Sequence, residues 1–339
     1  MDRGIGFVGV GMFGFVLARH LALKYPQDKF LAYDADKEVL ESLKRERRHP
    51  IHFRDYLLPG NVFPTDDLEM LASSCQIIIL SLPTQRIRSA AEKLAEYIKD
   101  KTVLVNMAKG LEIGTGKRIS EIVREKIDKG YTYAVISGGT IAGEMIRGFP
   151  LSAEVACQDE NTGFLIQNLF STERFRVYRN DDVTGVELAG ALKNPLSIAA
   201  GIAWGLGFGS STIGALVSRG AFEIKKLALC LGAKEKTFAF GGQAAMGDIM
   251  TSCFGDTRNR RFGQLIVEKG SVNKALDIMR KEGKLVEGYY TSFATCWLSE
   301  KYGVEMPIQR EVYHILHEGK DPRLSLVQLM TRTLKSVGE

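Results

Sequence analysis

The chain has 339 residues, of which 45% are hydrophobic and 25% charged, and its formal net charge is +5. This composition excludes a disordered chain, and the length favours two domains over a single core. The longest apolar strand-like run, 77–82, is far shorter than the roughly 20 residues that cross a bilayer, and no signal-peptide pattern opens the chain. We therefore expect a cytoplasmic protein with no transmembrane segment. Because basic residues are interleaved with acidic ones, we also expect that the protein does not bind nucleic acid.

The first half of the chain alternates short β-branched runs with helical patterns. This alternation predicts a mostly parallel sheet with helices on both faces, the arrangement of a Rossmann-type α/β domain. Runs without polar alternation, such as 77–80, fit a sheet that is buried on both sides. The predicted strands are 5–10, 29–34, 75–83, 102–108 and 132–138, and the predicted helices are 15–25, 37–46 and 87–98.

The second half is predicted to be entirely helical. Patterns rich in Ala, Leu and Gly follow one another from about Glu187, with no comparable strand between them. We therefore predict a Rossmann-type domain over 1–188 and an all-α domain over 189–339. The predicted helical stretches are 185–209, 213–233, 271–283, 290–303 and 308–319.

The cysteines give no sign of a disulfide framework or a metal site. There are five, they are widely scattered, and none forms a C-x-x-C pair. We expect reduced thiols that serve mainly in packing, and no metal cofactor.

Three glycines near the N-terminus form the pattern G-x-G-x-x-G between a predicted strand and a predicted helix. In this context Gly9 would permit a tight turn, Gly11 would let a pyrophosphate approach the backbone, and Gly14 would let the helix pack closely on the strand. The alternative is an ordinary structural turn. The context favours a dinucleotide site.

Asp34 ends the next predicted strand, 20 residues after Gly14. A carboxylate at this position accepts hydrogen bonds from ribose hydroxyls and repels a 2′-phosphate, and the neighbouring Ala35 supplies no guanidinium. The sequence therefore predicts NAD in preference to NADP, with use of both left open. The alternative role for Asp34 is an exposed turn residue before a helix.

Lysines and an arginine accompany glycines in three further stretches. Lys193 stands out because its helical neighbours are almost entirely apolar, and desolvation of a lysine ammonium favours release of its proton, as general acid and base catalysis requires. Lys109 lies in "NMAKGLE", and Arg258 with Asn259 in "TRNRRFG" could bind a phosphate. A solvated surface charge is the alternative for each.

Taken in order, these stretches resemble the NAD(P)-dependent glycerol-3-phosphate dehydrogenases over nearly the whole chain. The resemblance rests on "GVGMFG", "DYLLPGNVFPTDDLEML", "IIILSLPTQRIR", "AVISGGTIAGE", "GVELAGALKNPLSIAAGIAWGLGFG", "MGDIMTSC", "TRNRRFG", "VEG" and "MPIQREVYHIL". It implies hydride transfer between a nicotinamide cofactor and a three-carbon phosphate, interconverting dihydroxyacetone phosphate and sn-glycerol 3-phosphate for glycerophospholipid synthesis. It also implies that 1–188 form the dinucleotide-binding domain and that 189–339 bind the substrate and join two chains in a homodimer.

The resemblance also implies roles for individual residues. Lys193 takes the acid/base position, Lys109 stabilises the developing alkoxide, and Asp248 is a substrate-side carboxylate that completes the catalytic set. The implied substrate-binding residues are Lys109, Gly138, Thr140, Lys193, Asp248, Thr257, Arg258 and Asn259. The implied cofactor-binding residues are Gly9, Gly11, Met12, Phe13, Gly14, Asp34, Lys109, Ala142, Arg258, Leu285 and Glu287.

The sequence departs from the family pattern in the substrate loop. Gly139 stands where the family has proline, and Ile141 where it has phenylalanine. Two alternatives remain open at this point. One is another β-hydroxyacid or sugar-acid dehydrogenase of the same two-domain plan, and the other is a non-catalytic NADH-binding protein.

Overall fold

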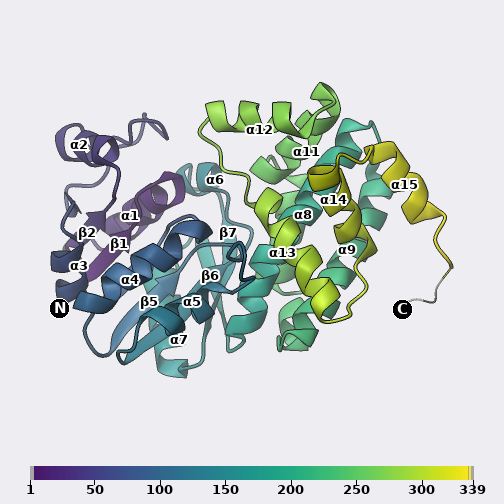
Figure 1. Ribbon diagram of the computed structural model, residues 1–339. Helices are drawn as coiled ribbons and strands as arrows, with labels where there is room; N and C mark the ends of the chain where they lie inside the picture. Colours follow the sequence, from purple (N-terminus) through teal and green to yellow (C-terminus); the bar gives the residue numbers. More distant parts are fainter. Residues whose placement is uncertain (1–3, 335, 337–339) are drawn as a thin grey trace. The chain divides into compact units, whose positions relative to one another are not determined.

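The computed structural model describes residues 4–334 and 336, which divide into two compact units (Figure 1). The first unit contains residues 4–112, 117–190 and 233–248. The second contains 113–116, 191–232 and the described residues from 249 onward. The sequence predicts one boundary, after residue 188. The structure instead divides the chain at Gly190 and assigns the short segment 113–116 to the second unit and 233–248 to the first.

The first unit is built on one eight-stranded sheet with the order β3-β2-β1-β4-β5-β6-β7-β8. All neighbouring strands are parallel except β6 and β7, which are antiparallel. The strands are β1 (Ile5–Val8), β2 (Phe30–Tyr33), β3 (Val62–Thr65), β4 (Ile77–Leu80), β5 (Thr102–Asn106), β6 (Tyr131–Ser137), β7 (Leu151–Cys157) and β8 (Phe175–Asn180).

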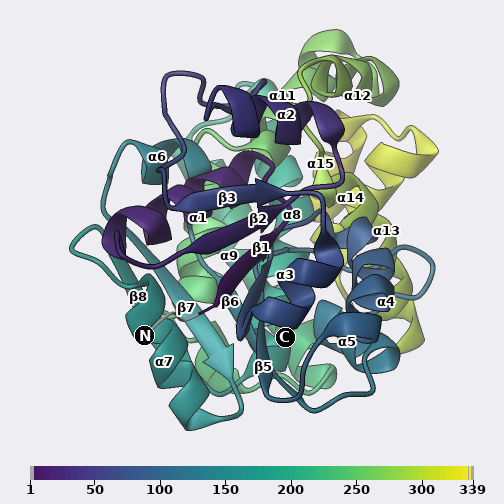
Figure 2. The same cartoon turned by 90° about the vertical axis from the view of Figure 1, so that its left-hand side faces the viewer.

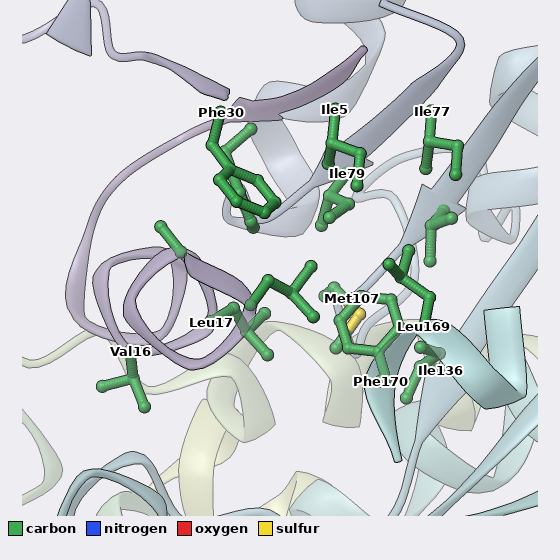
Figure 3. Packing of buried hydrophobic residues seen from close by; sticks show 14 of the residues in the cluster. Ile5, Val16, Leu17, Phe30, Ile77, Ile79, Met107, Ile136, Leu169 and Phe170 are labelled. Carbon is green, nitrogen blue, oxygen red and sulfur yellow. The ribbon is translucent and has the colours of Figure 1, made fainter. Parts of the chain in front are cut away.

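Helices cover both faces of this sheet, and Figure 2 shows the sheet between these two layers of helices. Helices α1, α6 and α7 pack on one face, where alternate strand residues such as Ile5, Ile79 and Ile136 form the core shown in Figure 3. Helices α3, α4 and α5 pack on the other, against Ile78 and Leu104. The helices of this unit are α1 (Met12–Lys24), α2 (Lys37–Arg45), α3 (Leu68–Ser74), α4 (Ile87–Tyr97), α5 (Ile119–Lys126), α6 (Ala142–Ile146) and α7 (Glu160–Phe170).

Short helical turns complete the first unit. They are the 3-10 turns η1 (Thr84–Arg86) and η2 (Glu235–Phe238) and the π turn η3 (Gln243–Gly247). The buried Glu154 in β7 accepts hydrogen bonds from the backbone amides of Gln243 and Ala244, at 2.5 and 3.1 Å, which fastens η3 to the sheet. This contact explains why 233–248 belongs with the sheet.

The described residues of the second unit form helices joined by loops, with no strand among them. Helix α8 enters it from the first unit and carries Pro195 in its interior, and α10 begins at the last residue of the first unit. The helices are α8 (Val183–Gly205), α9 (Ser210–Cys230), α10 (Asp248–Phe254), α11 (Arg258–Lys269), α12 (Val272–Lys281), α13 (Glu287–Lys301), α14 (Pro307–Glu318) and α15 (Pro322–Met330). The predicted fold class, a Rossmann-type α/β domain followed by an all-α domain, is confirmed.

Candidate active site

The glycine loop joins β1 to α1 in the manner that the sequence predicts. Gly9 has φ +97°, and a Cβ at Gly14 would lie 2.1 Å from the Gly9 carbonyl oxygen, so the helix and the loop touch backbone to backbone. A Cβ at Gly11 would meet no atom within 4 Å, so the backbone there is open to approach. Gly11 is also the N-cap of α1, and no side chain in the described part of the chain caps this helix. Its amides are therefore available to an anionic group, as binding of a pyrophosphate requires.

Asp34 lies immediately after β2, where its carboxylate is held by two backbone amides. The Val10 amide donates to Oδ2 at 2.7 Å, and the Asp36 amide donates to Oδ1 at 3.0 Å. These bonds fix the carboxylate beside the glycine loop. Each oxygen keeps a lone pair for a ribose hydroxyl. A carboxylate that is fixed beside a glycine loop in this way fits the binding of a dinucleotide.

Lys109 is centred in a cluster at the carboxyl ends of β5 and β6. Its ammonium donates to the Gly138 carbonyl oxygen at 2.6 Å and to Asp248 Oδ2 at 2.7 Å. The Asp248 side chain is 3% exposed, whereas that of Lys109 is 20% exposed. Thr140 joins the cluster because its amide also donates to the Gly138 oxygen, at 2.7 Å. The first unit thus brings four predicted substrate residues together, with a lysine whose charge is still partly open to solvent.

Lys193 lies on α8 within the second unit and is buried, with 7% exposure. Its ammonium donates to the hydroxyl of Ser252 on α10. The Ser252 carbonyl oxygen in turn accepts from the hydroxyls of Ser197, at 2.6 Å, and Thr257, at 2.8 Å. A buried ammonium needs a hydrogen-bonded partner, and these contacts fix the position of the hydroxyl that serves as one.

Asn259 and Arg258 begin α11, whose N-cap is Thr257. Asn259 Nδ2 donates to Asn194 Oδ1 at 2.9 Å, and its Oδ1 accepts from the Gly288 amide at 3.1 Å. The Arg258 side chain is exposed, yet the surrounding protein desolvates its guanidinium and lowers its pKa, an effect that the Glu287 carboxylate opposes. A helix N-terminus beside a guanidinium is a favourable place for a phosphate.

Two glycines set the distance between α8 and α11. A Cβ at Gly201 would lie 1.9 Å from the Arg260 carbonyl oxygen, and one at Gly263 would lie 2.2 Å from the Ile198 carbonyl oxygen. Any side chain at either position would push the helices apart. This close crossing places the start of α11 against the turns of α8 that follow Lys193.

The remaining predicted residues fall into the same two groups. Met12 and Phe13 open α1, and Ala142 begins α6, all in the first unit. In the second unit, Glu287 is the first residue of α13, and Leu285, which is 37% exposed, lies two residues before it. Two residues that the sequence reasoning missed, Ser252 and Asn194, contact Lys193 and Asn259, respectively. The i, i+4 spacing of Asp248 and Ser252, which places both on one face of α10, could have indicated Ser252.

Comparison with known proteins assigns the chain. Residues 4–163 match the model described as NAD-dependent glycerol-3-phosphate dehydrogenase N-terminus, and residues 182–326 match the corresponding C-terminus model. The chain belongs to the NAD-dependent glycerol-3-phosphate dehydrogenase family. The resemblance inferred from the sequence motifs is thereby confirmed.

Individual relatives of this family match the chain end to end. A protein of Clostridium botulinum (strain Alaska E43 / Type E3), named glycerol-3-phosphate dehydrogenase (NAD(P)+), is 38% identical over 333 residues, or 98% of each chain. A protein of Geobacter sulfurreducens with the same name is 36% identical and covered over 99% of each chain. The crystal structure of glycerol-3-phosphate dehydrogenase from Coxiella burnetii is 30% identical, with a TM-score of 0.90 over 97% of this chain and 98% of that one.

Two further observations concern metals and membranes. Within residues 4–334 and 336, no group of three or more His, Cys, Asp or Glu side chains is placed to hold a metal ion. Over the same residues, no helix of this glycerol-3-phosphate dehydrogenase family member is both long and apolar enough to span a bilayer.

Proposed function

We propose that this protein interconverts dihydroxyacetone phosphate and sn-glycerol 3-phosphate with NAD(H), and that Lys193 is its acid/base residue. The family assignment over the full chain supports an NAD(P)-dependent glycerol-3-phosphate dehydrogenase. The observation that carries the catalytic role is the burial of Lys193, whose ammonium donates a hydrogen bond to the hydroxyl of Ser252. An ammonium that is held in place by a hydroxyl can serve as a proton donor to a substrate oxygen.

Each proposed residue has a role that follows from its contacts. Lys193 would give its proton to the C2 oxygen of the ketone and take it back in the reverse direction. Lys109, held by Asp248 and the Gly138 oxygen, would place a positive charge near the oxygen as it becomes an alkoxide. Arg258, Asn259 and the amides at the start of α11 would bind the phosphate, with Thr257 beside them.

The nicotinamide cofactor would be held by the glycine loop and Asp34. When bound, it supplies the hydride that the ketone accepts. The open backbone at Gly11 leaves room for the pyrophosphate, and Met12, Phe13 and Ala142 lie at the starts of the two helices beside it. The anchored Asp34 carboxylate, with Ala35 beside it, supports NAD over NADP.

The state of assembly and the compartment belong to the same proposal. The family resemblance suggests a homodimer joined through the helical unit, and the cytoplasm is the compartment that we propose for it. In support of a protein partner, α15 exposes Leu324, Val327 and Met330, which are 62, 58 and 76% exposed and recur every three residues along the helix. Analytical ultracentrifugation measures the mass in solution, and a monomer at micromolar concentration would contradict the dimer.

The test of the reaction is oxidation of NADH, followed by its absorbance, with dihydroxyacetone phosphate as the substrate. We expect turnover with the phosphate and far less with unphosphorylated dihydroxyacetone, because the phosphate site would be empty. Lys193→Met should lower kcat by roughly 10²- to 10⁴-fold while NADH binding, measured by fluorescence, is retained. Reduction of a 2-keto acid in place of the phosphate would favour the β-hydroxyacid alternative. Binding of NADH without turnover of any of these substrates would favour a non-catalytic protein.

A further inference from the structure

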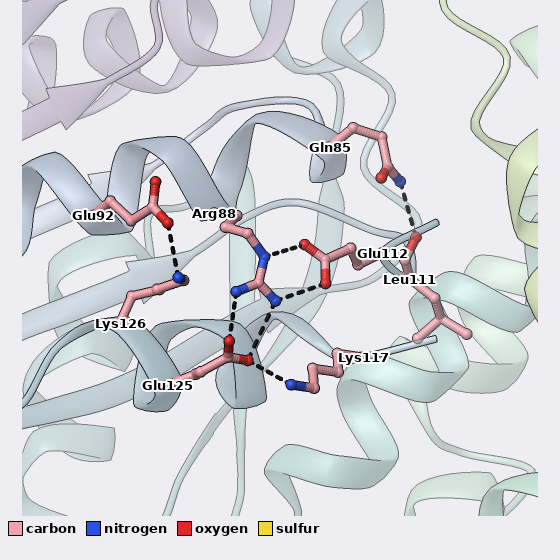
Figure 4. Close-up of polar contacts among 8 residues, drawn as sticks. All are labelled: Gln85, Arg88, Glu92, Leu111, Glu112, Lys117, Glu125 and Lys126. Atoms are coloured by element: carbon pink, nitrogen blue, oxygen red, sulfur yellow. Dashed lines mark hydrogen bonds and ion pairs between the residues drawn. The ribbon is translucent and has the colours of Figure 1, made fainter. Parts of the chain in front are cut away.

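Lys109 lies on a loop in which the next residues but one, Leu111 and Glu112, are held by hydrogen bonds. The loop runs from the end of β5 to the start of α5 and contains no helix or strand. Gln85 Nε2 donates to the Leu111 carbonyl oxygen at 2.9 Å, and Arg88 donates to both carboxylate oxygens of Glu112, at 2.7 Å from Nε and 2.8 Å from Nη2 (Figure 4). These contacts hold the two residues that follow Gly110, which itself follows Lys109.

Arg88 also reaches α5, so a single guanidinium joins the loop to two helices. Its Nη1 donates to Glu125 Oε1 at 2.7 Å, and its Nη2 lies 3.3 Å from Glu125 Oε2 (Figure 4). The side chains of Arg88 and Glu112 are 26% and 12% exposed, so the pair is largely shielded from solvent. A two-pronged, shielded pair of this kind fixes geometry far better than an exposed ion pair does.

Glu112, the residue that Arg88 holds, lies at a boundary between the two units. Glu112 is the last residue of the first unit before 113–116, which belongs to the second unit. There Gly116 lies against Trp297, since a Cβ on Gly116 would be 2.8 Å from that ring. The Glu112 amide donates to the Lys117 carbonyl oxygen at 3.0 Å, so the two residues that flank 113–116 are bonded to each other. If Glu112 were not fixed, a displacement of 113–116 would also displace the backbone of Lys109, which lies four residues before this segment.

We propose that Arg88 is a positioning residue for the reaction: it fixes Glu112 and thereby the backbone that presents Lys109. This inference rests on the proposed function, in which Lys109 acts on the substrate. The chain offers a matched control, because Lys126 on α5 donates to Glu92 on α4 at 2.8 Å and so joins the same two helices without contacting the loop (Figure 4).

The experiment compares Arg88→Met, Glu112→Gln, the double variant and Lys126→Met. For Arg88→Met and Glu112→Gln, we expect kcat/KM for dihydroxyacetone phosphate to fall by about tenfold, because a displacement of about 1 Å at a catalytic group has a cost of that order or more. KM for NADH should not change. The double variant should be no worse than either single variant, since both remove the same link. Lys126→Met should keep the kinetic constants of the wild type.

A purely structural role predicts a different result. Arg88→Met and Lys126→Met would then lower the thermal midpoint alike, with kinetic constants unchanged below it, and that result would overturn the inference. If Arg88→Met does not yield folded protein, Glu112→Gln decides by the same criterion, and Arg88→Lys, which keeps the charge without the fork, should retain intermediate activity. Lys109→Met separates the two proposals: wild-type turnover in that variant would refute the role of Lys109 itself.

Discussion

Glu223 gives the sharpest quantitative prediction, because its carboxylate is buried at a helix terminus. It lies on α9 with 3% exposure and accepts hydrogen bonds from the amides of Ile308, at 2.9 Å, and Gln309, at 3.2 Å, at the start of α14. Desolvation raises its pKa from 4.5 to about 7, although these amides and the charges of Lys226 and Arg219 act to lower it. Desolvation therefore outweighs the contacts that favour the charged form.

The raised pKa makes the stability of the protein depend on pH. Because the folded state binds this proton more tightly than the unfolded state, the contribution of Glu223 is fully present below the unfolded pKa of about 4.5 and is lost as the pH rises through about 7. A shift of this size corresponds to about 3 kcal/mol of unfolding free energy. Glu223→Gln removes the titration and keeps an oxygen that can accept one of the two amides.

Urea unfolding measures this effect, and the chain supplies its own probe. Both tryptophans, Trp204 and Trp297, belong to the second unit, as does Glu223, so their fluorescence reports the unfolding of this unit. Relative to wild type, Glu223→Gln should gain about 3 kcal/mol of unfolding free energy between about pH 5 and pH 8. The contributions of all other titrating groups cancel when the unfolding free energy of the wild type is subtracted from that of the variant at each pH. Parallel stability curves for the two proteins would refute the reasoning.

Two further predictions concern the active site. Ser252→Ala removes the hydroxyl that accepts from Lys193 and should lower kcat about tenfold, as expected for one charge-assisted hydrogen bond, with NADH binding unchanged. Ser252→Thr keeps the hydroxyl and is the control, so equal kcat values for the two variants in steady-state assays would contradict the role of the hydroxyl. Asp34→Gly combined with Ala35→Arg should shift the ratio of kcat/KM for NADPH to that for NADH by at least about tenfold toward NADPH, because a repulsive carboxylate is replaced by a guanidinium. An unchanged ratio would show that Asp34 does not select the cofactor.

The sequence predicted the centre of the sheet better than its edges. β1 and β4 are uninterrupted apolar runs, and both are buried along their whole length. The strands predicted from the sequence do not include β3 and β8, which are the two edge strands. β3 contains Pro64, which an edge strand tolerates, and β8 alternates buried with exposed residues. β7 was omitted as well, since Glu154 interrupts its apolar run, and the reason for a charge there is its bond to the remote η3.

The residues of the candidate site were predicted unequally for a related reason. Lys193 stands out in the sequence because a charge among apolar neighbours is rare, and the glycine loop because its spacing is regular. Ser252 and Asn194 carry no such signal, because their roles depend on which side chains the packing of the helices places beside them. That packing depends on contacts such as Gly201 against Arg260, between residues far apart in the sequence.

The division of the chain shows most clearly what composition cannot predict. A change in composition can mark the passage near Gly190, since long segments of different character lie on either side of it. The segments 113–116 and 233–248 are too short to have a composition of their own, yet each changes unit within a few residues of a proposed catalytic side chain. Ile113 comes four residues after Lys109, and 233–248 ends at Asp248 itself. Because Lys109 lies so close to the point where the chain changes unit, its backbone needs to be fixed within the first unit. The two-pronged contact between Arg88 and Glu112 meets that requirement.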